Sequence, residues 1–234
     1  MDLFGGGGGH PHFFKKGKVS MFYDNLKGIK INALGDSYLE GDKLERQYTW
    51  PRLMAEKYGM EFTNHGKNGS TMSDFVDTNK PMVVRYVDLP DNEPDLVFLE
   101  GGRNDYNKCV PIGDLHSTDT KTFAGAARFL ITRLREKYPN APLLCMTNWE
   151  VGGKPNAAGH MCSDYGRAFM AVCDDMGVPY INGIDQDEVG VYMTDPEFRQ
   201  KYCQHANDIS HFNAEGMKRI LPMFEKRFSE ILKK

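Results

Sequence analysis

Short apolar runs alternate along the chain with longer stretches in which apolar residues recur every three or four positions. The short runs predict five β-strands, at residues 29–34, 60–64, 95–99, 142–147 and 178–181. The recurring spacing predicts four helices, at residues 49–58, 122–138, 158–176 and 214–232. Strands and helices alternate, which is typical of an α/β fold with parallel strands and helices on both faces of the sheet.

Individual residues indicate where some helices begin and end. Thr49 can cap the first helix, Pro51 suits its first turn and Gly59 can close it. Pro222 lies inside the pattern of the last helix, and it predicts either a kink or a later start. The aromatic and methionine residues on the helix faces indicate sides that point to the core. There is no internal repeat, no phosphate-binding loop and no G-x-G-x-x-G after a strand.

The first residues differ in composition from the rest of the chain. Five consecutive glycines, Gly5 to Gly9, precede His10 and His12, and such a glycine run is typical of a flexible linker. The two histidines could touch a metal, although a solvated tail is the more ordinary interpretation. We therefore predict a flexible tail or linker at residues 1–18 and one folded domain at residues 19–234.

Composition and charge limit the classes of function. The chain has 234 residues, enough for one sizeable domain, and 40% of them are hydrophobic. The formal net charge of −3 gives no electrostatic case for nucleic acid or an anionic membrane as partner. No apolar run approaches the roughly 20 residues that span a bilayer. The N-terminus has no secretory signal pattern, which favours a cytoplasmic location; a trimmed signal would leave secretion open.

The cysteines and histidines give no evidence of a metal site or a disulfide framework. The five cysteines are odd in number and none forms a C-x-x-C pair. Cys145 and Cys173 lie in apolar elements, so we expect buried thiols there, and a single bridge stays open. The remaining histidines show no metal-ligand spacing, so no metal is predicted: His65, His116, His160 and His205.

The strand at residues 29–34 ends abruptly in Gly35-Asp36-Ser37-Tyr38. Gly35 allows a tight turn that a Cβ would strain, and Asp36 and Ser37 can cap a following helix. A serine at this point would lie at the C-terminal edge of the sheet, where open α/β folds bind ligands. This is a favourable place for a nucleophile, and it is also an ordinary strand-to-helix turn.

Two further loops follow predicted strands and carry possible hydrogen-bond donors. In the loop at residues 64–71, the backbone N–H of Gly69 could serve as an oxyanion donor, with a plain loop as the alternative. After the strand at residues 95–99, Asn104 presents a neutral amide that can donate to a developing oxyanion and does not titrate. Asp105 is expected to fasten its loop rather than to act in chemistry.

A fourth stretch, just before the last predicted helix, contains Asp208 and His211. In a bent loop the Asp208 carboxylate can bond one imidazole nitrogen of His211 while the other nitrogen faces Ser37. That arrangement would set the tautomer and stabilise the imidazolium that forms during attack. A lone histidine before a helix is more often structural, so the argument depends on its placement at the same sheet edge.

Together these stretches resemble the SGNH (GDSL-type) hydrolase family along residues 29–232. Gly35-Asp36-Ser37-Tyr38 matches the nucleophile block of the family, with a tyrosine where leucine is usual. Gly69 and Asn104 match the second-block glycine and the third-block asparagine. Asp208 and His211 match the final D-x-x-H. Four blocks in the expected order form a specific signal.

The resemblance implies a flavodoxin-like, three-layer α/β/α fold around a central five-stranded parallel sheet. It also implies a triad of Ser37, His211 and Asp208, with no metal or organic cofactor. The oxyanion hole would consist of the backbone N–H groups of Ser37 and Gly69 and the side chain of Asn104. The tyrosine at position 38 alters packing behind the nucleophile and leaves these roles unchanged.

The activity that follows is hydrolysis of carboxylic esters through an acyl-enzyme. The loops at the sheet edge are polar and lack a long apolar lid, which favours short acyl groups such as acetyl on a carbohydrate or another polar alcohol. Asp36, Tyr38 and Trp149 are candidates to contact substrate, although a loop tryptophan can equally pack on its own domain. The alternatives are a lipase, thioesterase or lysophospholipase of the same family, or a non-catalytic carbohydrate-binding module. A homo-oligomer is compatible with all of these.

Overall fold

The computed structural model describes residues 22–76 and 80–233. Within them, five strands form one sheet in the order β2-β1-β3-β4-β5, and every neighbouring pair is parallel. The strands are β1 (Lys30–Gly35), β2 (Glu61–Gly66), β3 (Leu96–Gly101), β4 (Leu143–Thr147) and β5 (Tyr180–Ile181). The expected five-stranded parallel sheet is thus confirmed. The predicted tail, residues 1–18, lies outside the described residues.

Helices lie between consecutive strands and after the last one, and several of them have only one or two turns. The α-helices are α1 (Ser37–Glu40), α2 (Trp50–Tyr58), α3 (Met82–Arg85), α4 (Arg103–Asn107), α5 (Phe123–Lys137), α6 (Cys162–Asp175), α7 (Gln186–Val189), α8 (Pro196–Tyr202) and α9 (Ala214–Ile231). The 3₁₀ turns are η1 (Asp24–Leu26), η2 (Arg46–Tyr48) and η3 (Tyr86–Asp88). The four helices that the sequence predicts are α2, α5, α6 and α9. Most of the other helices are too short to produce a helical period in the sequence.

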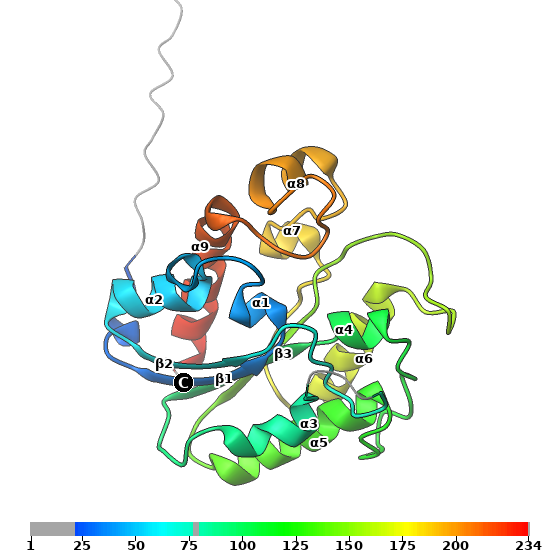
Figure 1. Cartoon of the computed structure of the whole chain (residues 1–234). Coiled ribbons are helices and arrows are strands. Elements are labelled where there is room, and N and C mark those ends of the chain that lie inside the picture. Colours follow the sequence, from blue (N-terminus) through cyan, green and yellow to red (C-terminus); the bar gives the residue numbers. More distant parts are fainter. Residues whose placement is uncertain (1–21, 77–79, 234) are drawn as a thin grey trace, which may run out of the picture.

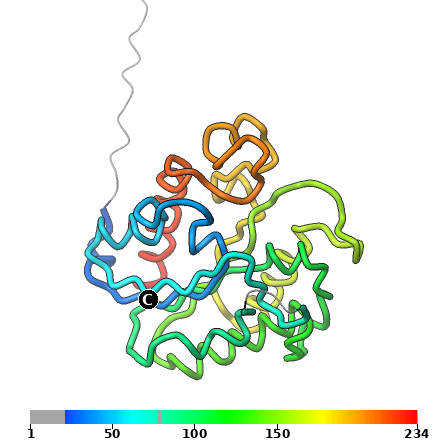
Figure 2. The backbone as a smooth tube through the Cα atoms, viewed as in Figure 1, coloured from blue at the N-terminus to red at the C-terminus, as the bar shows by residue number. Residues whose placement is uncertain are grey.

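The helices form a layer on each face of the sheet, which completes the three-layer α/β/α architecture. Helices α2 and α9 cover one face, and α3, α5 and α6 cover the other (Figure 1). The chain path in Figure 2 shows the same division, with the blue and red ends of the chain on one side and the green middle on the other. The first and last described parts of the chain therefore meet on one face, where α9 contacts α2 and the turn at Asp24–Leu26.

Alternate residues of the strands pack into the two hydrophobic cores, as strand geometry requires. Along β3, Phe98 points to the core under α2 and α9, whereas Leu99 points to the core over α5 and α6. In the first core the ring of Trp50 stacks on Phe224 of α9, with centroids 3.8 Å apart and planes 7° apart. This contact joins α2 to the C-terminal helix.

Several local details differ from the sequence predictions. The Thr49 side chain does not cap α2; its hydroxyl donates to the carbonyl of Arg46. Gly59 does close that helix, in a left-handed conformation. Pro222 lies within a continuous α9 that begins at Ala214, so the helix start is not delayed. Strand β5 is shorter than expected.

Replacing Trp50 by alanine should destabilise the protein by about 3–5 kcal/mol, because the ring is fully buried and stacks on Phe224. Trp50→Phe keeps an aromatic ring at this position, so its loss of stability should be much smaller. Urea denaturation followed by circular dichroism measures both losses. Equal stability of Trp50→Ala and the parent would show that this contact does not hold α2 and α9 together.

Candidate active site

The turn that carries Ser37 joins the end of β1 to the start of α1. Asp36 caps α1 as predicted, because its carboxylate accepts the N–H of Tyr38 at 2.9 Å. The reason for a glycine at position 35 differs from the prediction. Gly35 is not in a left-handed conformation; instead, a Cβ there would lie 2.1 Å from Oε1 of Glu100 on β3. The close approach of the Glu100 side chain therefore favours glycine at this position.

The segment between α8 and α9 brings a histidine to Ser37, as the sequence predicts. The Nε2 atom of His211 lies 3.0 Å from Oγ of Ser37. Its Nδ1 atom lies 3.3 Å from Oδ2 of Asp208. The other Asp208 oxygen accepts the backbone N–H groups of Ser210 and His211 at 2.8 and 2.9 Å. The backbone at residues 208–211 thus holds the Asp208 carboxylate by one oxygen, and the other oxygen faces the imidazole of His211.

A second carboxylate near the histidine was not identified from the sequence. Oδ2 of Asp42, in the loop after α1, lies 3.9 Å from Nδ1 of His211. Its other oxygen accepts a hydrogen bond from Nδ2 of Asn68 at 2.6 Å. Asn68 precedes Gly69, so Asp42 lies between the histidine and the loop with the predicted oxyanion donor. No sequence pattern marks this aspartate, because the fold alone brings it there.

The predicted oxyanion donors surround the same turn. Gly69 is exposed with a φ of +75°. Within the described part of the chain, the backbone N–H groups of Ser37 and Gly69 donate no hydrogen bond. Nδ2 of Asn104 donates to Oδ2 of Asp36 at 3.0 Å and to the carbonyl of Ser70 at 3.1 Å. The amide therefore lies against the nucleophile turn with both of its protons already engaged.

Asp105 fastens its loop, as predicted. Its two carboxylate oxygens accept the backbone N–H groups of Met72 and Ser73 at 3.0 and 3.1 Å. These bonds join the loop after β3 to the loop after β2. The preceding Gly102 has a φ of +112°, a conformation that favours glycine, so the chain turns sharply at the sheet edge.

A buried arginine, also missed from the sequence, supports the turn from below. The guanidinium of Arg85 donates to the carbonyls of Gly35 and His65 at 2.8 and 2.7 Å. It also donates to Oγ of Ser70 at 2.9 Å and to the carbonyl of Lys80 at 2.8 Å. Because it bonds to the C-terminal ends of both β1 and β2, Arg85 holds the strand ends that carry the candidate site.

A buried carboxyl pair lies directly behind the nucleophile turn. Oε1 of Glu100 accepts the backbone N–H of Asp36 at 2.5 Å, and Oε2 has no partner among the described residues. Burial, followed by the negative charge of Asp36, raises the pKa of Glu100 well above its usual value. Burial also raises the pKa of Asp36 to about 6. Of the two buried carboxyls, Glu100 is therefore the one whose protonated form is favoured more strongly. A lone glutamate in an apolar strand is the signal that could have identified it.

The residues predicted to contact substrate are buried. Asp36, Tyr38 and Trp149 are 0%, 6% and 1% exposed. The Trp149 ring packs against Tyr38 and Phe212, with centroids 5.7 and 5.8 Å away, so it follows the packing alternative. A cavity of about 10 Å³ lies between these rings, Ser37 and His211. Contact of these side chains with a substrate stays a prediction.

Across residues 22–76 and 80–233, no group of three or more His, Cys, Asp or Glu side chains could hold a metal ion. All five cysteines are free, and Cys145 and Cys173 are buried as predicted. None of the helices in this part of the chain is long and apolar enough to span a bilayer.

Comparison with known proteins identifies the family and the fold that this chain shares with others. The model of the GDSL-like lipase/acylhydrolase family matches residues 33–219. A crystal structure of a protein from Lactobacillus plantarum is 26% identical, covers 87% of this chain and 98% of its own, and has a TM-score of 0.75. A structure from Bacteroides uniformis, described as a GDSL-like lipase, is 20% identical with a TM-score of 0.64. The match covers 87% of this chain and 97% of that one.

A further solved structure is a family two carbohydrate esterase from Clostridium thermocellum in complex with cellohexaose. It is 16% identical, with a TM-score of 0.57, and the match covers 88% of this chain and 66% of that one. Among curated proteins, no significant match is found. The solved structures below 25% identity establish the shared fold.

The free energy of unfolding should decrease as the pH rises from about 4.5 toward 7. Burial raises the pKa of Glu100 well above its usual value and the pKa of Asp105 to about 7. The folded protein keeps protons that the unfolded chain releases above its own carboxyl pKa values. This stabilisation is complete below those values and is lost as the pH passes the folded-state pKa. Urea denaturation at a series of pH values measures the decrease.

Glu100→Gln resembles the protonated side chain, so the decrease should be smaller in this variant than in the parent. Glu136 is an exposed glutamate paired with Arg133 on α5, and Glu136→Gln is the matched control. The control should keep the pH dependence of the parent. If the Glu100→Gln curve ran parallel to that of the parent, Glu100 would not hold the proton.

Proposed function

Because the chain belongs to the GDSL-like lipase/acylhydrolase family, we propose that it is a serine esterase that hydrolyses carboxylic esters through an acyl-enzyme. One observation carries this proposal. The Ser37 hydroxyl lies 3.0 Å from Nε2 of His211, whose Nδ1 faces Asp208 at 3.3 Å. A nucleophile, a base and a group that orients the base thus lie in line, which is the arrangement that acyl transfer by serine requires.

The reaction proceeds in two halves. Oγ of Ser37 attacks the ester carbonyl carbon while Nε2 of His211 takes the hydroxyl proton, and Asp208 stabilises the imidazolium. The tetrahedral intermediate collapses, the alcohol leaves with the proton from His211, and Ser37 is acylated. Water then attacks the acyl carbon with His211 as base, which releases the carboxylic acid and restores the serine.

Three donors stabilise the oxyanion in this scheme. The backbone N–H groups of Ser37 and Gly69 are free to donate within the described chain. Asn104 would exchange its bond to the neutral carbonyl of Ser70 for the oxyanion, while its bond to the Asp36 carboxylate keeps the amide oriented. Loss of one such donor costs roughly 10²–10³ in turnover.

The preferred substrates are short acyl esters, such as acetyl esters, of a carbohydrate or another polar alcohol. The cavity of about 10 Å³ beside Ser37 and His211 has room for about one water molecule, and a long acyl chain would find no enclosed space there. The shared fold with a carbohydrate esterase in complex with cellohexaose supports a sugar as the alcohol part. A lipase, thioesterase or lysophospholipase activity is the alternative within the family, and a non-catalytic carbohydrate-binding module is the alternative outside catalysis.

Ser37→Ala should abolish esterase activity, with a loss on the order of 10⁶ in turnover, and should leave the fold intact. The measurement is hydrolysis of p-nitrophenyl esters from acetate to decanoate, beside labelling with a fluorophosphonate, which reacts only with an activated serine. Activity should be highest on acetate and fall with chain length. Activity that rises with length would favour a lipase, and an unlabelled, inactive parent would favour a binding module.

Of the two carboxylates near His211, Asp208 should matter more than Asp42. Asp208 lies closer to Nδ1, at 3.3 against 3.9 Å, and the backbone of its own turn orients it. We expect Asp208→Asn to lower kcat on p-nitrophenyl acetate by about 10²–10⁴ and Asp42→Asn by about tenfold. Steady-state kinetics measure both. A larger loss in Asp42→Asn would assign Asp42 as the partner of the imidazole.

A further inference from the structure

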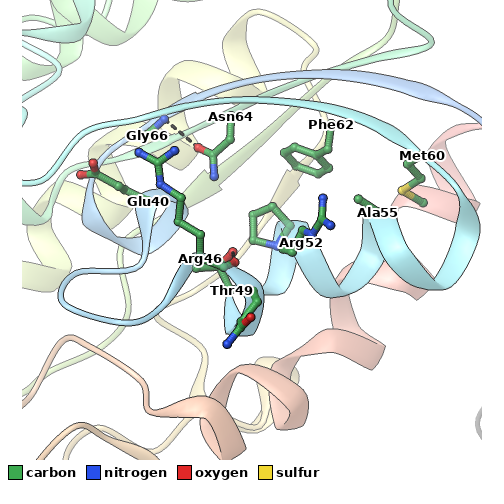
Figure 3. Close-up of a pocket in the computed structure, with 11 residues that line it drawn as sticks. Glu40, Arg46, Thr49, Arg52, Ala55, Met60, Phe62, Asn64 and Gly66 are labelled. Carbon is green, nitrogen blue, oxygen red and sulfur yellow. Dashed lines mark hydrogen bonds between the residues drawn. The ribbon is translucent and has the colours of Figure 1, made fainter.

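A second and much larger pocket lies at the edge of the sheet, between β2 and the segment from η2 to α2. Its volume is about 440 Å³, compared with about 10 Å³ for the cavity beside Ser37. Strand β2 lies at the edge of the sheet, and no further strand from the described residues covers this side. Figure 3 shows the pocket open between the strand and α2. The scheme for ester hydrolysis uses none of the side chains that line it.

The floor of the pocket is apolar and well supported. Phe62 and Met60 come from β2 and the residue before it, and Pro51 and Ala55 come from α2. Phe62 is half-buried and packs edge-on against Trp50, with centroids 5.5 Å apart. The floor is therefore part of the folded core and does not need to form when a ligand binds.

Most polar groups of the lining already have partners inside the protein. Asn64 donates to the carbonyl of Leu39 and accepts the N–H of Gly66. Arg52 pairs with Glu56 one turn further along α2, at 2.8 Å. These groups are therefore engaged, and they leave few donors and acceptors for a ligand.

Two charged side chains of opposite sign remain available. The guanidinium of Arg46 has no hydrogen-bond or ion-pair partner among residues 22–76 and 80–233, and in Figure 3 the side chain extends between Glu40 and Asn64 toward Gly66. Glu40 uses one carboxylate oxygen to accept the N–H of Asn68 at 2.5 Å. The pocket thus offers a guanidinium donor and a carboxylate acceptor above an apolar floor.

This combination selects a ligand of a particular chemistry. An anion would be repelled by Glu40 and a cation by Arg46, so a charged ligand gains little from the pair. A hydroxyl group can donate to the carboxylate and accept from the guanidinium. A neutral ring that carries hydroxyl groups at its edge and an apolar C–H face matches the two charged side chains and the Phe62 floor at the same time. A sugar unit has this chemistry.

The pocket lies next to the nucleophile turn. Gly66 lines the pocket at the C-terminal end of β2, and it pairs in register with Gly35, two residues before Ser37. Glu40 is three residues after Ser37 in α1, which is a rise of about 4.5 Å along a helix. Gly69, with its free N–H, follows three residues after Gly66. A chain bound in the pocket can therefore continue past this loop to the serine.

We propose that this pocket is a carbohydrate subsite, which binds a neutral sugar unit next to the one that carries the ester. The proposal rests on the proposed esterase function and makes it more specific: the substrate is an acylated oligosaccharide or polysaccharide rather than an acylated monosaccharide. Arg46 and Phe62 then determine specificity, and they leave the chemistry at Ser37 unchanged.

The kinetic test compares a substrate that reaches the pocket with one that does not. The variants are Arg46→Ala and Phe62→Leu, with Arg133→Ala as control, because Arg133 is an exposed arginine on α5 at the opposite face of the sheet. On p-nitrophenyl acetate, all three variants should have the same kcat/KM as the parent. On partially acetylated cello-, xylo-, manno- or chito-tetraose, Arg46→Ala and Phe62→Leu should lose about tenfold in kcat/KM through a higher KM.

Two results of this comparison would overturn the subsite. One is that neither variant changes kcat/KM on any tetraose that the parent hydrolyses. The other is that both substrates lose activity equally, which would indicate a general structural effect. In either case the ester hydrolysis by Ser37 would stand.

Binding without catalysis tests the pocket independently of the proposed reaction. Isothermal titration calorimetry of Ser37→Ala with the four unacetylated tetraoses should detect binding of at least one. Adding Arg46→Ala should weaken it about tenfold, and adding Arg133→Ala should not. If the parent hydrolysed no ester, the proposed function would fail while this measurement still decided the pocket. No tetraose binding, or binding that does not depend on Arg46, would overturn the inference.

Discussion

The contact between the end of β1 and the side chain of Glu100 determines where the candidate nucleophile lies. Glu100 projects from β3 under the turn, accepts the N–H of Asp36, and leaves no room for a Cβ at Gly35. Arg85 holds the same turn through the carbonyl of Gly35. Because these groups are buried, the turn cannot shift without leaving a polar group unpaired, which is costly in a protein interior. The rigid support places Ser37 at the sheet edge.

The same support separates two electrostatic environments on the two sides of Ser37. Behind the turn, burial and the proximity of two carboxyls favour a protonated Glu100. In front of it, Asp208 and His211 are partly exposed, at 10% and 26% of their side chains, and face each other. The buried pair therefore favours a bound proton, and in the proposed mechanism His211, which is accessible, transfers the proton of Ser37. The same turn would then combine a stable support with a reactive serine.

The sequence predicted the architecture because parallel buried strands and amphipathic helices leave a clear apolar pattern. It also brought together Ser37 and His211, which are 174 residues apart, because both belong to blocks that match the SGNH family. It could not predict Arg85 or Asp42 as parts of the site, and the only signal of Glu100 is a lone glutamate at the end of an apolar strand. Their roles depend on which side chains meet after folding, and a charged residue in a helix or loop leaves no periodic signal. Thr49 shows the limit for local rules, since its hydroxyl bonds a carbonyl instead of capping α2.

The pocket between β2 and α2 could not be read from the sequence, since its residues appear there as an ordinary strand and an ordinary helix. The strand order creates it, because β2 lies at the edge of the sheet and next to β1. The same order brings Gly66 beside Gly35, so any ligand in the pocket lies close to the nucleophile turn. In the proposed mechanism the edge strand therefore has two roles: the loop after it supplies Gly69, and its open side provides a surface along the approach to Ser37. The position of one strand would then determine both the proposed oxyanion loop and the surface available to the rest of a substrate.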